Sequence, residues 1–143
     1  MAAKLESAVT IASPVEEVYR FLLDLDQHPT DPGVESVVKT PDGPTAQGTA
    51  FHFHHSGRPR QTTMRFTSLE ANRNIHFEGH VGPLRPDGDF SFQRTDRATR
   101  LTVRVAANPI GPFRLLTPLI NRKGQEIWDQ RLARIKAALE APA

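Results

Sequence analysis

The stretch FHFHH, residues 51–55, carries the pattern that decides the fold. Successive side chains of a β-strand point to opposite faces of a sheet, so Phe51 and Phe53 share one face while His52 and His54 share the other. The same alternation of apolar and polar residues recurs along residues 64–67, 75–81, 89–92 and 101–105. One face of the predicted sheet is therefore aromatic and aliphatic. The other face carries histidine, arginine, glutamate and threonine.

Six consecutive strands are predicted from this alternation and from the turns that separate its segments. They are expected over residues 34–40, 48–55, 60–70, 75–81, 89–94 and 99–106. Strands joined by such short turns pair with their neighbours as an antiparallel meander. We expect the apolar face of this sheet to pack against a helix and the polar face to meet water.

The start of the chain predicts a strand over residues 5–11 and then a helix. Ser13 suits the N-cap of that helix, and Glu16 three positions later completes a capping box. The expected apolar stripe consists of Val15, Val18, Phe21 and Leu22. The helix should end near Asp24, and residues 26–33 predict a turn or a short second helix because prolines and a glycine prevent a long one.

The end of the chain predicts a proline-broken connection over residues 108–118 and one long helix, with Thr117 as its N-cap, that runs to Leu139. One broad arc of this helix is apolar and is expected to lie against the sheet. The arc consists of Leu116, Ile120, Ile127, Trp128, Leu132, Ile135 and Leu139, and the opposite side carries Arg122, Glu126, Asp129, Ala133 and Lys136. The order of strand, helix, six strands and long helix predicts an α+β fold.

The length, charge and composition of the chain limit the classes of molecule that it could bind. The chain has 143 residues, a net charge of +2 and no cysteine, so we expect one domain, residues 1–143, without disulfide bonds or a structural metal. Basic residues are scattered among acidic ones, which argues against a nucleic-acid-binding face. Neither a signal peptide nor a membrane span is apparent. We expect a cytoplasmic protein, monomeric or homodimeric, that does not insert into membranes and needs no cofactor.

The histidine cluster admits a metal-binding, a catalytic or a purely solvated interpretation. In the predicted meander the strand that carries Arg65 separates His52 and His54 from the histidines of residues 75–81. Side chains two strands apart are about 9.6 Å apart, whereas zinc holds nitrogen ligands at about 2.1 Å. We therefore expect no metal site and place the histidines on the solvated face. A catalytic role would require a bulge that turns His52 or His54 inward.

Two residues interrupt the apolar arc of the long helix. Gly124 either allows close packing against a bulky sheet residue or leaves space for a ligand, and glycine there costs about 1 kcal/mol of helix stability relative to alanine. Arg131 either forms a structural ion pair, or extends to a cavity edge, or binds a ligand carboxylate, enolate or carbonyl.

Four segments together resemble the START-like superfamily, also called SRPBCC or the birch-pollen-allergen fold, and within it the polyketide cyclase/dehydrase-like group. They are ASPVEEVYRFLLD (12–24), GTAFHF (48–53), TSLEANRNIHFEG (67–79) and RLARIKAALE (131–140). The resemblance implies a curved seven-stranded antiparallel sheet wrapped around the C-terminal helix, the helix-grip arrangement, with an apolar cavity between them. Many relatives carry a tryptophan after the short helix region, whereas PTDPG (29–33) has none.

The resemblance also implies that the partner is a small hydrophobic molecule such as a lipid, a quinone or an aromatic polyketide. The expected ligand-binding residues are Phe21, Phe51, Phe53, Met64, Phe66, Phe77, Phe90, Phe92, Phe113, Leu116, Ile120, Gly124, Ile127, Trp128 and Arg131. The alternative is a polyketide cyclase or dehydratase that uses Arg131 to stabilise an enolate, although the sequence offers no evident base. Distant relatives also bind proteins, and nothing in the sequence selects that role.

Overall fold

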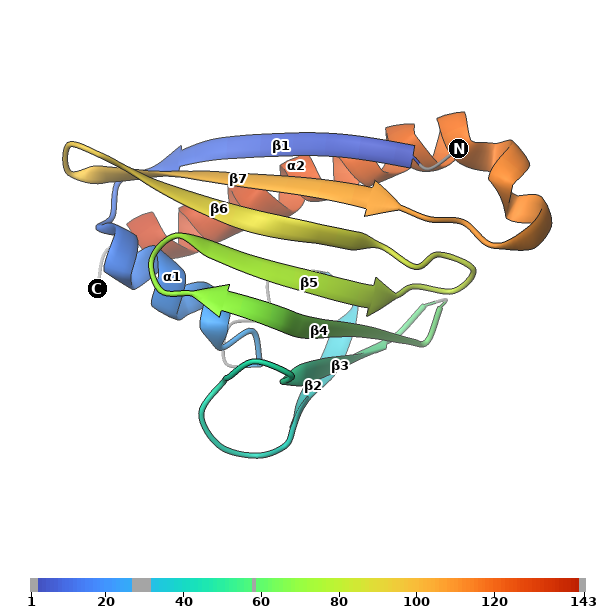
Figure 1. Ribbon diagram of the computed structural model, residues 1–143, viewed down its shortest axis with the longest axis horizontal. Helices are drawn as coiled ribbons and strands as arrows, with labels where there is room; N and C mark the ends of the chain where they lie inside the picture. Colours follow the sequence, from blue (N-terminus) through green and yellow to red (C-terminus); the bar gives the residue numbers. More distant parts are fainter. Residues whose placement is uncertain (1–2, 27–31, 58, 142–143) are drawn as a thin grey trace.

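Seven strands form one curved antiparallel sheet, and a long helix crosses one of its faces (Figure 1). The structure is a computed structural model that describes residues 3–26, 32–57 and 59–141. Its elements are β1 (Ala3–Ile11), α1 (Val15–Leu23), β2 (Val34–Thr40), β3 (Ala50–His55), β4 (Gln61–Glu70), β5 (Asn74–His80), β6 (Asp87–Thr95), β7 (Ala98–Ala107), the 3-10 helix η1 (Gly111–Leu116) and α2 (Thr117–Glu140). The predicted turn or second helix over residues 26–33 lies mostly outside the described residues.

The strand order β1-β7-β6-β5-β4-β3-β2 confirms the predicted meander from β2 to β7. The first strand joins the sheet beside the last one, with Leu5 opposite Val105 and Ser7 opposite Val103. The helix α2 then runs back beneath β1 and β7, and α1 lies at the end where the β6–β7 turn is found (Figure 1). The α+β, helix-grip prediction is confirmed. No helix in the described part of the chain is both long and apolar enough to cross a membrane.

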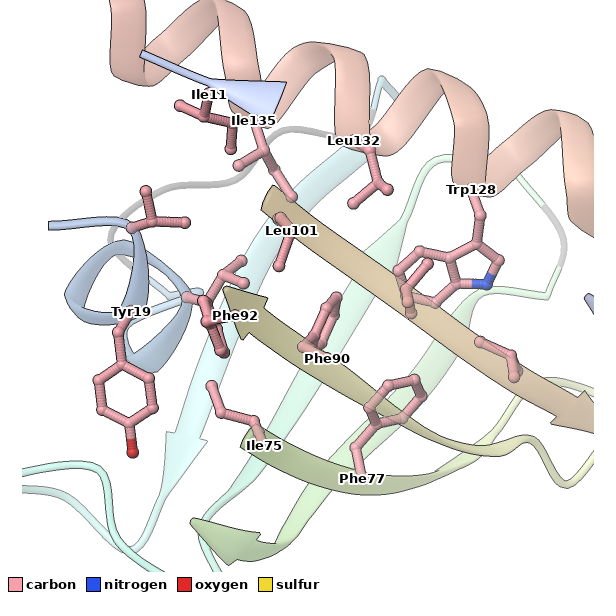
Figure 2. Close-up of a cluster of buried hydrophobic side chains, with 14 of the residues drawn as sticks. Ile11, Tyr19, Ile75, Phe77, Phe90, Phe92, Leu101, Trp128, Leu132 and Ile135 are labelled. Atoms are coloured by element: carbon pink, nitrogen blue, oxygen red, sulfur yellow. The ribbon is translucent and has the colours of Figure 1, made fainter. Parts of the chain in front are cut away.

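The core forms on the face that the period-two pattern marks as apolar. Its largest fully buried side chains come from the strands and both α-helices: Phe51, Phe66, Phe77, Phe90, Ile11, Leu22, Ile75, Leu101, Leu132, Val18 and Val103. Figure 2 shows Trp128 of α2 directed toward Phe77 and Phe90 of the sheet. Its ring centroid lies 5.9 Å from that of Phe77 and 5.7 Å from that of Phe90, the range in which aromatic pairs attract one another.

Only the second half of α2 is buried, which differs from the predicted continuous stripe. Its buried residues are Trp128, Leu132 and Ile135, whereas Leu116 and Ile127 are 45% and 46% exposed. The backbone of the helix lies closest to β1, an edge strand, whereas the side chain of Trp128 reaches Phe77 of β5 and Phe90 of β6. The first half of α2 therefore leaves part of its apolar arc exposed, although it contacts β1 at Gly124 and Gln125.

The polar side of α2 also departs from the prediction, because part of it is bonded to β1. The hydroxyl of Ser7, which faces the core, donates to the Asp129 carboxylate at 2.5 Å. The Lys136 ammonium donates to the carbonyl oxygen of Thr10 at 2.6 Å. Helical phase alone could not reveal these partners, because the sequence does not say which strand the helix follows.

Both predicted helix caps are wrong. Pro14 occupies the N-cap position of α1, and no side chain caps that helix. The Ser13 hydroxyl instead donates to the Leu139 carbonyl at 3.5 Å, which ties the start of α1 to the end of α2. Thr117 is already helical, and its hydroxyl donates to the Arg114 carbonyl at 2.6 Å. In each case the residue is satisfied by a different partner, which local motifs do not encode.

The buried face of α1 is rotated slightly from the predicted stripe. Tyr19 is buried and packs edge-on against Phe92, with ring centroids 5.3 Å apart, whereas Phe21 is only half-buried. Burial raises the pKa of the Tyr19 hydroxyl, because the ionised phenolate is poorly solvated there. The aromatic ring at the α1–sheet contact is therefore a tyrosine that the sequence pattern did not select.

Gly88 is required by close packing inside the sheet. A Cβ atom there would lie 2.3 Å from the Arg104 carbonyl oxygen and 3.1 Å from the Phe77 ring. We expect Gly88→Ala to lower the free energy of unfolding by about 1–3 kcal/mol, because the backbone of β7 must shift. Gly57→Ala is the matched control, since nothing lies within 4 Å of that added Cβ. Urea denaturation measures both, and equal midpoints would contradict the packing argument.

Candidate functional site

A cavity of about 390 Å³ lies between the sheet and α2. Every strand of the sheet contributes to its sheet wall, including Leu5 of β1 and Val34 of β2, and its helix wall runs from Leu116 to Ile135, with two leucines from the α1 region at one side. The side chains that border it are mainly apolar. Predicted ligand-binding residues on its wall are Phe53, Met64, Phe77, Phe90, Leu116, Ile120, Gly124, Ile127, Trp128 and Arg131.

Three of the residues that line the cavity are small and leave space there. On the sheet wall these are Gly79 and Ala107, and on the helix wall it is Gly124. A Cβ on Gly79 would lie 3.0 Å from the Thr63 carbonyl oxygen, so a side chain there would force a small shift of its neighbours. Trp128 borders the space and packs on Phe77, which keeps the helix and the sheet apart.

Gly124 lies both at a close contact between helix and strand and at the cavity, which are the two situations that the sequence left open. A Cβ atom at this position would lie 2.7 Å from Cδ2 of Leu5, so α2 approaches β1 more closely than alanine allows without a shift. Both Gly124 and Leu5 also border the cavity. A side chain added at Gly124 must therefore displace Leu5 or enter the cavity itself.

His55 borders the cavity, and the prediction that the histidines lie outside is wrong for this residue. Residues 51, 53 and 55 share a face, so the second histidine of the HH pair falls on the phenylalanine side. No bulge is needed to turn it inward. Its Nε2 lies 2.8 Å from the hydroxyl oxygen of Thr62, which also borders the cavity. The alternation of side-chain direction along the strand could by itself have identified His55 as a residue of the apolar face.

Two cationic side chains border the helix wall, Lys123 and Arg131. The Arg131 guanidinium carbon lies 4.4 Å from the centroid of the Trp128 ring, a cation–π contact that holds the group at the cavity wall. No aspartate or glutamate is among the described residues that line the cavity. The polar part of the wall thus consists of cations, a histidine and threonines.

The remaining predicted ligand-binding residues lie away from the cavity wall. Phe51 and Phe66 are fully buried and pack on each other with centroids 5.1 Å apart. Phe92 packs on Tyr19, and Phe21 lies against the same core. Phe113 is 42% exposed in η1. Facing the apolar side of the sheet is therefore not sufficient, because most of that side is filled.

Two other histidines of the described strands are engaged on the outer face. His52 lies within hydrogen-bond distance of the hydroxyls of Thr40 and Thr63, at 2.9 and 3.3 Å. His76 Nε2 lies 2.8 Å from Asp87, and its Nδ1 lies 2.5 Å from the Thr67 hydroxyl. Within residues 3–26, 32–57 and 59–141, no group of three or more histidine, cysteine or acidic residues could hold a metal ion.

Solved structures share this fold at low sequence identity. The di-domain ARO/CYC StfQ from the steffimycin biosynthetic pathway superposes with a TM-score of 0.78 at 19% identity, over 98% of this chain but 51% of its own length. The chain thus spans about half of that protein. TTHA0849 from Thermus thermophilus gives 0.74 at 19% identity, over 95% of this chain and 96% of its own. A START superfamily protein from Mycobacterium smegmatis gives 0.74 at 14% identity, covering 96% and 97%.

The comparison with curated proteins gives no match. The family described as "Polyketide cyclase / dehydrase and lipid transport" matches residues 2–140, which is nearly the whole chain. That match and the structural neighbours confirm the START-like resemblance read from the four sequence segments. The seven-stranded sheet, the long C-terminal helix and the family match lead to one conclusion: the chain belongs to the polyketide cyclase/dehydrase and lipid transport family.

Proposed function

We propose that this protein binds a small, largely hydrophobic molecule between the sheet and α2. The observation that carries the proposal is the cavity of about 390 Å³ with its mainly apolar wall. Cavities of about 300–1,000 Å³ suit organic ligands, and apolar burial supplies affinity at about 25 cal/mol per Å². The family description, which includes lipid transport, supports the same class of function.

The polar groups on the wall support a ligand that also carries an acidic or electron-rich oxygen. Lys123 and Arg131 lie on the helix wall, beside mainly apolar side chains. A cation beside an apolar cavity favours a partner of opposite charge because the apolar surroundings screen it weakly. The planar guanidinium of Arg131 suits a carboxylate, an enolate or a carbonyl. A lipid acid or an aromatic polyketide fits this description.

Cyclisation or dehydration of a polyketide is a second candidate, and His55 is the observation that favours it. Aldol closure needs a base that removes an acidic C–H proton and a donor that stabilises the resulting enolate. His55 on the sheet wall offers an imidazole nitrogen, and Arg131 on the helix wall offers a fixed cation. A molecule held between the two walls would lie between these groups.

Filling the cavity tests the binding proposal. We expect Gly124→Leu to weaken binding of naphthoate at least about tenfold, because the new side chain occupies ligand space. The matched control is Ala138→Leu, which adds a leucine at an exposed position of the same helix. Isothermal titration calorimetry measures affinity, and circular dichroism checks that both variants fold. Unchanged affinity in the folded Gly124 variant would place the ligand elsewhere.

Arg131 is expected to select for an acidic group. Arg131→Gln should weaken naphthoate binding by roughly tenfold, the value of a hydrogen bond to a charged group, while naphthol binding changes by less than about threefold. Calorimetry is required, because Arg131 lies over Trp128 and its loss would itself alter the tryptophan fluorescence. Arg122→Gln, on the same helix but outside the cavity wall, is the control. An equal loss of affinity for naphthoate and for naphthol would show that Arg131 contributes through packing rather than through recognition of charge.

Catalysis is tested with a poly-β-ketone thioester and product analysis. If the protein turns this substrate over, His55→Gln should lower the rate by about 100-fold or more, the usual contribution of a general base. Naphthoate binding should persist in that variant. Thr62→Val, which removes only the hydroxyl next to His55, is the matched control. Full turnover in the His55 variant would exclude it as the base.

A further inference from the structure

An exposed apolar surface surrounds the end of the cavity formed by η1 and the start of α2. We call it the apolar end, and it consists of Ile110, Phe113, Leu115, Leu116 and Leu119, with exposed fractions of 42% to 86%. Leu116 and Leu119 also line the cavity, as does the half-exposed Ile127. Contiguous apolar surface of this kind on a globular protein marks an interaction site. In Figure 1 this segment, drawn in orange between β7 and α2, projects beyond the ends of the strands.

The charged residues within the segment that forms the apolar end are all basic. Residues 97–125 contain no aspartate or glutamate, and in and beside the apolar end they carry Arg114, Arg122 and Lys123. The neighbouring β5–β6 loop, whose Pro83 carbonyl accepts from the Ile110 N–H, adds Arg85 and no acid over residues 81–86. Apolar side chains flanked by cations are typical of segments that lie in the interface of an anionic bilayer.

The shape and chemistry of the apolar end favour a bilayer over a protein partner. Leu115 is 86% exposed, so its side chain projects into solvent and is available to enter a lipid layer. Pro109, Pro112 and Pro118 lack N–H donors, which reduces the hydrogen bonds that the segment could offer a protein. A second copy of the chain, packed face to face about a two-fold axis, would bring the arginines of each apolar end against those of the other.

We propose that the apolar end docks on the surface of an anionic lipid bilayer. The apolar side chains enter the boundary between head groups and acyl chains, while Arg85, Arg114 and Arg122 meet the lipid phosphates and carboxylates. Docking in this orientation places the cavity mouth, at Leu116 and Leu119, next to the acyl chains. The docking rests on the exposed surface alone and does not depend on which molecule the cavity binds.

Vesicle co-sedimentation of the full chain tests the proposal. We expect binding to vesicles of phosphatidylcholine mixed with phosphatidylserine, and weak binding to pure phosphatidylcholine. High salt should weaken the binding, because it screens the charges. Ile110→Gln/Leu115→Gln should reduce the partition coefficient at least about tenfold. Val38→Gln removes an apolar side chain of β2 that is about as exposed as Ile110, 48% against 47%, and should have no effect.

The contribution of the cationic side chains to docking is tested in the same vesicle assay. Arg114→Gln/Arg122→Gln should weaken binding to the anionic vesicles by roughly tenfold or more, at about fivefold per cation. The control, Arg73→Gln/Arg97→Gln, removes one arginine from the β4–β5 turn and one from the β6–β7 turn, and both turns lie at the end of the sheet opposite η1 (Figure 1). Naphthoate binding in solution and thermal unfolding verify that each variant retains its cavity and its fold, since none of the substituted residues lines the cavity.

Three outcomes would overturn the proposal. The first is no binding to anionic vesicles by the wild-type chain. The second is binding that none of the apolar-end variants reduces. The third is a concentration-dependent dimer, detected by analytical ultracentrifugation, that Ile110→Gln/Leu115→Gln dissociates, because a second copy would then cover the surface. Loss of vesicle binding with naphthoate affinity intact separates docking from the ligand-binding function.

Discussion

The contact between Trp128 and the sheet is the constraint on which the rest of the structure depends. The indole lies against Phe77 and Phe90, and the guanidinium of Arg131 lies over it. Beyond this ring toward the C-terminus, Leu132 and Ile135 are buried, and the helix is fixed to the sheet. Toward the start of α2, the helix carries Gly124, and Leu119 and Ile127 are about half-exposed. The ring therefore borders both the packed core and the cavity.

This division of α2 explains why the same helix has two physical characters. Its second half is held by apolar burial and by polar bonds to β1, such as that between Ser7 and Asp129. Its first half borders the cavity through Gly124 and Ile120 and exposes Leu119 and Ile127 to solvent. An apolar helix face that leaves the sheet must be covered by a ligand, by another surface, or by water. The cavity, its mouth and the apolar end all follow from that geometry.

The cavity wall joins an apolar majority with a few polar groups from opposite sides. His55 and Thr62 belong to neighbouring strands, whereas Lys123 and Arg131 belong to the helix. Apolar surface gives affinity without orientation, and sparse polar groups give orientation. This combination is compatible with binding and with proton transfer, and the same residues serve in both proposals. The two functions differ only in whether His55 acts on the bound molecule.

The sequence by itself determined the strands, the meander, the long helix and the family, because alternation and helical period are local properties that burial imposes on residue order. It also placed Phe53, Phe77, Trp128 and Arg131 on the interior side. Tertiary structure decided which interior side chains pack on one another, as Phe51 and Phe66 do, and which border open space. It assigned Ser13 and Thr117 to partners other than their predicted caps. Those outcomes depend on the distance between α2 and the sheet, which no local pattern specifies.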